Sequence, residues 1–149
     1  MREILFRGKR RDDGQWVYGY LVKLPSPIQI GDSSPWHIIV PPVDPDDSGG
    51  RYNVDPNTVG QYTGLTDKNG KKIFEGDILS YSKSKESVYF DTSLRIPCFT
   101  TGIGRGSSTG AHPYKLSARH VIIGNIHDNP EMLKEAAKKG HNETLMPLA

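Results

Sequence analysis

The sequence has almost no cysteine and no long apolar run. Its single cysteine, Cys98, excludes an internal disulfide and any metal site built from several thiolates. A lone thiol fits a reducing compartment, so we expect a cytoplasmic protein. No apolar run approaches the about 20 residues that a membrane-spanning helix needs. The run Ile4–Phe6 near the start is far too short for a signal peptide, and we expect no membrane partner.

An excess of one charge is also lacking. Nineteen Lys and Arg residues against seventeen Asp and Glu residues give a net charge of +2, which alone points to no particular partner. Basic residues nevertheless crowd the start of the chain at Arg7, Lys9, Arg10 and Arg11. Charge runs usually form solvated loops, and the sharper alternative is that these side chains contact a nucleic-acid backbone. Both interpretations stay open.

Glycine and proline, by contrast, are abundant, with 16 and 11 residues in a chain of 149. That proportion favours a turn-rich β protein over a helical one. A chain of this length fits one domain. We therefore expect a mainly β (α+β) fold: one small, twisted, barrel-like β-sheet domain over residues 1–139 with a short C-terminal helix. Residues 140–149 are expected to be a flexible tail.

Short runs of aromatic and β-branched residues, separated by clusters of Gly, Pro and Asp, predict the strands. The run Val121–Ile123 is continuously apolar, which indicates a central, buried strand. The strands expected on this basis cover residues 3–7, 16–23, 36–40, 51–54, 78–81, 87–90 and 119–126.

A single helix is expected, opening at Asn129–Glu131 and ending before Gly140. Asn is a favoured helix cap, Pro fits the first turn, and Glu suits the positive end of the helix dipole. Met132, Leu133 and two alanines form a narrow apolar stripe at helical spacing. A helix this short must dock to be stable, so Met132 and Leu133 are predicted contact residues, against the chain's own sheet or a neighbouring copy.

Alternation in the segment Trp16–Lys23 places three aromatic side chains on one face of a strand. Trp16, Tyr18 and Tyr20 lie two residues apart and therefore point the same way. An exposed face with three large aromatic rings is unusual on a monomer, and such rings are enriched at protein interfaces. This pattern predicts an interaction surface, most simply between copies of the chain.

The densest signals lie in the stretch Tyr62–Tyr81. Its segment Asp67–Gly70 begins like a calcium loop, but glycine falls at position 4 instead of 6, and isoleucine occupies position 12 instead of glutamate. Asn-Gly is the favoured pair of a tight hairpin, and Glu75–Asp77 supplies a second turn. We therefore interpret these residues as structural turn positions: Gly64, Asn69, Gly70, Gly76 and Asp77.

No constellation of catalytic or cofactor-binding residues is evident. The run Gly102–Gly110 lacks the lysine of a phosphate-binding loop and the glycine spacing of a dinucleotide-binding loop, so it is interpreted as a flexible loop. The five histidines have no metal-ligand spacing. Cys98 follows a proline and precedes a phenylalanine, a setting typical of a buried, inert thiol. We expect no metal, no cofactor and no enzymatic activity.

Four blocks of the sequence stand in one colinear order: Arg2–Gly8, Val54–Gly60, Gln61–Ile78 and Ile123–Glu131. Together they resemble the YopX family of phage and prophage proteins. The resemblance implies a β-rich fold, an origin in a bacteriophage or another mobile element, and a bacterial host cytoplasm as the location. It implies no activity, because the family has no established enzymatic role.

Three functions from different classes remain open. The aromatic face favours a protein-interaction module that forms a homo-oligomer or binds another host or phage protein. The N-terminal basic residues favour a small β-barrel protein that binds nucleic acid, which a basic groove lined by aromatic rings would support. No constellation favours an enzyme, and the fold alone does not choose among the three.

Overall fold

The structure is a computed structural model, and it describes residues 3–25, 36–42, 50–81, 84–92, 98–101 and 120–134. The loop expected over Gly102–Gly110 and the tail expected over 140–149 lie outside the described residues. The chain divides into two compact units, Met1–Gly64 and Leu65–Ala149. The single domain predicted over residues 1–139 thus contains two such units. Their strands are antiparallel, and the prediction of a mainly β fold is confirmed.

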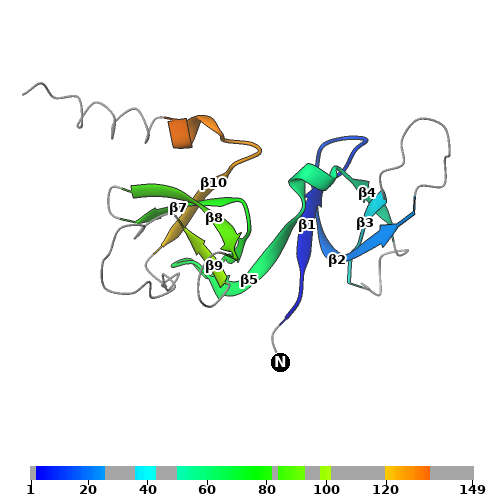
Figure 1. Ribbon diagram of the computed structural model, residues 1–149, viewed down its shortest axis with the longest axis horizontal. Coiled ribbons are helices and arrows are strands. Elements are labelled where there is room, and N and C mark those ends of the chain that lie inside the picture. Colours follow the sequence, from blue (N-terminus) through cyan, green and yellow to red (C-terminus); the bar gives the residue numbers. More distant parts are fainter. Residues whose placement is uncertain are drawn as a thin grey trace, which may run out of the picture. The chain divides into compact units, whose positions relative to one another are not determined.

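The first unit is one antiparallel sheet, with the strands in the order β4-β3-β2-β1-β5 (Figure 1). The first residues of β5 complete it, because Gly60 and Gln61 pair with β1. The strand bounds are β1 (Phe6–Lys9), β2 (Trp16–Leu24), β3 (Trp36–Val40), β4 (Tyr52–Val54) and β5 (Gly60–Thr66).

This sheet curls so that β4 returns to the end of β1. An isolated bridge joins Arg10 to Val54. Beside it, the Arg11 amide donates to the carbonyl of Asn53 at 3.0 Å, and the Asp55 amide donates to the carbonyl of Lys9 at 2.9 Å. A single bridge is not a ladder of paired residues. The described strands of this sheet therefore curl without closing into a barrel.

The inner side of the curl is packed with small and aliphatic residues. Ile39 and Val54 are fully buried there. A Cβ added to Gly8 would lie 3.0 Å from the Val54 Cβ and 3.3 Å from the Ile39 Cδ1. Only glycine at this position lets the end of β1 pass so close to the facing strands. Val17 and Leu21 of β2 share this inner face, opposite Gly8 and Ile39, and the aromatic residues of β2 lie on the outer face.

A single helical turn, η1 (Pro56–Thr58), follows β4. Asp55 caps it by accepting a hydrogen bond from the Asn57 amide at 3.0 Å. The Thr58 hydroxyl donates to the Asp55 carbonyl at 2.6 Å and accepts from the Lys9 amide at 2.9 Å. The turn is thereby fixed to the end of β1.

The second unit holds a four-stranded antiparallel sheet in the order β10-β7-β8-β9. Ile73, Leu79 and Val88 form its buried core, with Phe99 and Ile122 packed against them. The strand bounds in this sheet are β7 (Asp77–Tyr81), β8 (Ser84–Asp91), β9 (Cys98–Thr101) and β10 (Val121–Asn125). The short strand β6 (Lys72–Phe74) pairs with β5 instead.

The strand β10 lies at an edge of this sheet, so the prediction of a central strand at Val121–Ile123 is wrong. Among the described strands it pairs only with β7, and its register shifts between Ile122 and Gly124. Its residues are half-buried, not buried. An apolar run shows that a strand packs on a core, but it does not show whether a second strand lies beside it.

Residues 131–134 are helical, at the start of the expected helix. The Met132 amide donates to the carbonyl of Asn129 at 3.2 Å. The Asn129 side-chain oxygen accepts a hydrogen bond from the Asn125 backbone amide at 3.3 Å. The Asn129 side chain thereby holds the turn that precedes the helix. Met132 and Leu133 are half-buried. The remainder of the predicted helix, with its two alanines, lies outside the described residues.

Candidate interaction surface

The opening of the hairpin between β5 and β6 is organised by one buried carboxylate. The Asp67 side chain is only 4% exposed. One oxygen accepts from the amides of Asn69 and Lys71, each at 2.9 Å, and the other accepts from the Ile122 amide of β10 at 3.1 Å. Burial alone raises the pKa of Asp67, but the three N–H donors and the charge of Lys71 outweigh it and hold the pKa below its ordinary value.

The backbone bonds show which residues make this turn. The Gly70 amide donates to the carbonyl of Asp67 at 3.0 Å, so Lys68 and Asn69 are the central residues. The Asp67 amide donates to the carbonyl of Lys71 at 2.8 Å and closes a three-residue loop. Gly70 follows with a φ of 79°, the bulge position of such a loop. The turn therefore starts one residue earlier than the tight Asn69–Gly70 pair that the sequence predicts.

The second turn is held in the same way. Gly76 has a φ of 90°, and the Asp77 carboxylate accepts from the Phe74 amide at 2.8 Å across the turn. The Gly76 amide donates to the carbonyl of Val88, and its carbonyl accepts from the Ile126 amide, each at 2.9 Å. These contacts are structural. Within the described ranges, no group of three or more His, Cys, Asp or Glu residues could hold a metal ion.

Gly64, expected at a turn, lies inside β5. Its φ is 88°, a conformation that glycine adopts without strain and other residues avoid. Glycine at this position therefore indicated a positive φ correctly, but the prediction of a turn is wrong. A residue with positive φ can interrupt a strand as well as end one.

We expect Gly70→Ala to lower the free energy of unfolding by about 1 kcal/mol, because alanine strains at positive φ. An added Cβ meets nothing within 4 Å, so no steric clash contributes. Gly70→Asn should cost less, since asparagine tolerates this region. Urea unfolding curves of both variants measure the difference. Equal losses for alanine and asparagine would contradict a purely conformational cost.

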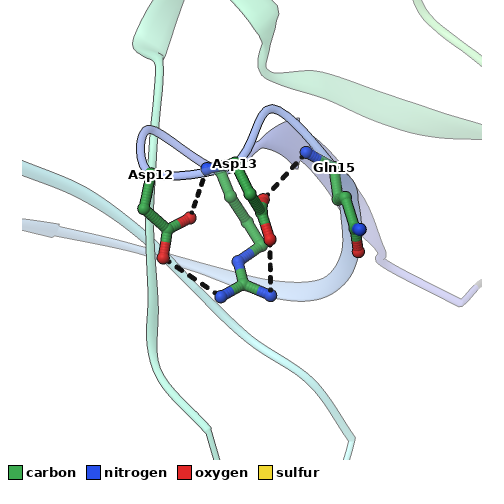
Figure 2. Close-up of polar contacts among 4 residues, drawn as sticks. Asp12, Asp13 and Gln15 are labelled. Atoms are coloured by element: carbon green, nitrogen blue, oxygen red, sulfur yellow. Dashed lines mark hydrogen bonds and ion pairs between the residues drawn. The ribbon is translucent and has the colours of Figure 1, made fainter.

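The basic run near the N-terminus is largely used within the fold. Asp12 and Asp13 lie in the turn after β1 (Figure 2), and their carboxylates lie 3.1 and 3.3 Å from the Arg10 guanidinium. The hydrogen bond from Arg10 lowers the pKa of Asp12. The Asp13 carboxylate also accepts from the Gln15 amide at 3.0 Å. Arg10 therefore serves the turn, with its guanidinium 4.5 Å from the Tyr52 ring centroid.

Arg7 and Lys9 flank Trp16 on the outer side of the sheet. They pair across the ladder with Tyr18 and Trp16, so all four side chains share one face. The Arg7 guanidinium lies 4.7 Å and the Lys9 ammonium 5.5 Å from the Trp16 ring centroid. Arg7 is only 5% exposed. The two cations cover Trp16, which is half-buried where the sequence predicted an exposed ring.

The charge of the first unit also bears on the basic run. Residues 1–64 contain seven Lys and Arg residues against eight Asp and Glu residues, a net charge of −1. Arg11 is exposed, and it lines a cavity of about 500 Å³ together with Lys9, Arg10 and Asp55. Asp12 and Asp13 accompany Arg10, and Arg7 and Lys9 face the Trp16 ring, so Arg11 is the only one of these four basic residues that is exposed.

The outer face of β2 and β3 is apolar and partly exposed. Alternate residues of β2 project there, and their exposed fractions are 44% for Tyr18, 56% for Tyr20, 39% for Val22 and 40% for Leu24. Across the ladder stand three half-buried residues of β3. We call this surface the β2–β3 face, made of Tyr18, Tyr20, Val22, Leu24, Trp36, Ile38 and Val40.

The comparisons with known proteins concern the chain as a whole. A family model described as "YopX protein" matches residues 5–134. The chain belongs to the YopX family. This confirms the resemblance inferred from the four sequence blocks. No curated protein matches the chain.

Protein EF1440 from Enterococcus faecalis is similar in structure. Its crystal structure aligns with a TM-score of 0.51 at 20% sequence identity, covering 89% of this chain and 99% of that one. At that identity the likeness shows a shared fold.

The blocks that resemble YopX contain the side chains that lock turns. Asp67 and Asp77 lie in the third block and Asp55 in the second. In the last block, the Asn125 side chain accepts from the amides of His127 and Asp128, at 3.0 and 2.9 Å. The YopX blocks thus specify scaffold, and the β2–β3 face lies between the first and second of them.

The sequence interpretation found only part of the β2–β3 face. It included Tyr18 and Tyr20 but missed Val22 and Leu24, although the same two-residue alternation continues to the end of β2. The residues of β3 carried no comparable signal, because their face depends on the register with β2.

Among the described residues, no helix is long and apolar enough to cross a membrane.

Proposed function

We propose that this YopX protein is a non-enzymatic protein-binding module that acts through the β2–β3 face. One observation carries the proposal: four consecutive outward residues of β2, from Tyr18 to Leu24, are large, apolar and each more than a third exposed. Contiguous exposed apolar surface rimmed by polar residues marks interaction sites on soluble proteins.

The chemistry of the face suits a protein partner better than a nucleic acid. The face carries aliphatic side chains beside its aromatic ones, and none of its side chains is charged. Cores of protein interfaces are depleted in charge and enriched in aromatic residues. Burial stabilises by about 25 cal/mol per Å² of apolar surface, so the half-exposed side chains of the face would each contribute on the order of 1 kcal/mol when covered.

The other expectations stay predictions beside this one. An origin in a phage or prophage, a cytoplasmic location in a bacterial host and a nucleic-acid contact at Arg11 or Lys9 are each compatible with a binding role. Catalysis is the hypothesis with least support, because buried carboxylates such as Asp67 are engaged in accepting hydrogen bonds from backbone amides.

A photo-crosslinking amino acid placed on the face tests the proposal. With the group at Val22, we expect crosslinks to protein in cells that express the chain, because the side chain lies where a partner packs. Lys23 is the matched control, since it is exposed on the same strand but points to the opposite face. Equal crosslinking at Lys23 and Val22, or none at either, would sink the proposal.

A further inference from the structure

We propose that Asn69 is a modification site: its side-chain amide is lost through a cyclic imide formed with the Gly70 nitrogen, at a rate set by how often the hairpin tip opens. The hairpin tip is residues 67–71, a part of the chain that the proposed function does not use. The inference follows from the residue pair at the tip, its exposure and the hydrogen bonds that hold it.

The pair Asn69–Gly70 has the chemistry for this reaction. The backbone nitrogen of Gly70 attacks the side-chain carbonyl carbon of Asn69 and forms a C–N bond. The side-chain nitrogen leaves as ammonia, which carries away the proton of the Gly70 amide. Water then opens the imide at either carbonyl, giving aspartate or isoaspartate. In isoaspartate the backbone runs through the former side chain.

The sequence and the exposure of the tip single out this asparagine. The chain has six asparagines, and Asn69 alone precedes glycine, which has no Cβ to hinder attack by its nitrogen. Asn69 and Gly70 are both exposed, and a Cβ added to Gly70 would meet nothing within 4 Å, so water has access. Three other asparagines precede β-branched residues, which crowd the attacking nitrogen: Asn53, Asn57 and Asn125.

The folded tip holds the pair in the wrong geometry for the reaction. The attacking group, the Gly70 amide, donates to the carbonyl of Asp67 at 3.0 Å. Asn69 is the second central residue of the turn, and in a type I turn this residue has a ψ of about 0°. That angle directs the Gly70 nitrogen away from the Asn69 side chain. The imide therefore forms only after the tip opens.

The Asp67 carboxylate sets how often the tip opens. One of its oxygens accepts from the amides of Asn69 and Lys71, each at 2.9 Å, and so fixes both sides of the reacting pair. Local opening of a hydrogen-bonded turn has its own free energy, which falls when its hydrogen bonds weaken. Weakening the contacts of Asp67 therefore speeds the reaction at Asn69.

Isoaspartate in place of Asn69 makes the opening permanent. It adds one carbon atom to the backbone of a three-residue loop and places a second carboxylate near that of Asp67. In the unmodified chain, the loop presents the Lys68 amide to the carbonyl of His120 and the Asp67 carboxylate to the amide of Ile122. We expect the isoaspartyl loop to lose both contacts, which frees the start of β10.

Incubation of the full-length chain at neutral pH, followed by mass mapping of the peptide that contains Asn69, tests the site. We expect amide loss at Asn69 to be at least tenfold slower in the folded wild type than in the same chain unfolded in guanidinium chloride, because only open tips react. Asp67→Asn keeps one acceptor oxygen, so its rate in the folded chain should lie between these two. Hydrogen exchange of the Gly70 amide should rank the three samples in the same order.

Four outcomes would overturn the inference or a part of it. Equal rates in the folded and the unfolded wild type would show that the turn does not protect Asn69. An unfolded chain that loses amide fastest at another asparagine would overturn the site. A folded Asp67→Asn chain with the wild-type rate would overturn the role of Asp67. An isoaspartyl chain, refolded after modification, whose Ile122 amide exchanges as slowly as in the wild type would overturn the release of β10.

Discussion

Asp67→Ala is expected to lower the free energy of unfolding by about 2–4 kcal/mol. The substitution removes the acceptor for three backbone amides, on Asn69, Lys71 and Ile122. A hydrogen bond to a charged group contributes more than a neutral one, and each buried donor left without a partner carries its own desolvation cost. Chemical denaturation measures the loss, and faster hydrogen exchange at the three amides locates it.

Two variants act as controls for this prediction. Asp67→Asn keeps one acceptor oxygen and turns an NH2 group towards a remaining N–H, so we expect an intermediate loss. Asp13→Ala removes a carboxylate that also accepts from a turn amide, but on an exposed turn of the first unit. Its effect on stability should be small. A loss for Asp13→Ala as large as that for Asp67→Ala would mean that burial is not what makes Asp67 important.

The same carboxylate predicts a pH dependence with a definite sign. The pKa of Asp67 is lowered in the folded chain from its ordinary 3.8. A lowered folded pKa stabilises the protein above the unfolded pKa, and that stabilisation disappears as the pH falls through the folded value. The advantage of the wild type over Asp67→Asn should therefore be constant near neutral pH and shrink below about pH 4. An advantage that grows with acid would contradict the assignment.

Gly19→Ala is expected to unfold the first unit, or to lower its stability by about 3 kcal/mol or more. An added Cβ would lie 2.6 Å from the Val40 carbonyl carbon and 2.7 Å from the Pro41 Cα. These are backbone atoms of the neighbouring strand, which no side-chain rotation can move. The β2–β3 pairing would have to separate, and the β2–β3 face would be lost with it.

Tryptophan fluorescence reads this effect directly, because both tryptophans, Trp16 and Trp36, lie in the first unit. Gly14→Ala is the matched control. Gly14 has a φ of 71° and nothing within 4 Å of an added Cβ, so only the conformational cost of about 1 kcal/mol applies. A Gly19→Ala chain with wild-type emission and midpoint would show that β2 and β3 approach less closely than described.

Local chemistry made much of the fold predictable. The strands at Trp16–Leu24 and Trp36–Val40 follow from alternating and β-branched residues, and the turns at Asp67 and Gly76 follow from Asx and glycine signals. These features depend on neighbours in sequence. The composition of a short segment is enough to specify them.

Features set by distant partners were not predictable. Val121–Ile123 looked central, but no local pattern records how many strands lie beside a strand. Trp16 looked exposed because Arg7 and Lys9 reach it only once β1 and β2 are paired. For the same reason, the β3 half of the candidate surface appeared only with the register in hand.

The hairpin tip at Asp67 has a further consequence for behaviour in concentrated solution. The Lys68 amide donates a hydrogen bond to the carbonyl of His120, just before β10. The Asp67 carboxylate accepts a hydrogen bond from the amide of Ile122, two residues after His120. These two groups belong to one edge of β10, where an open strand would otherwise recruit another chain. The turn thus shields the start of that edge from aggregation. Chains with a damaged hairpin tip should accumulate in insoluble form during expression, even when enough stability remains to keep them folded.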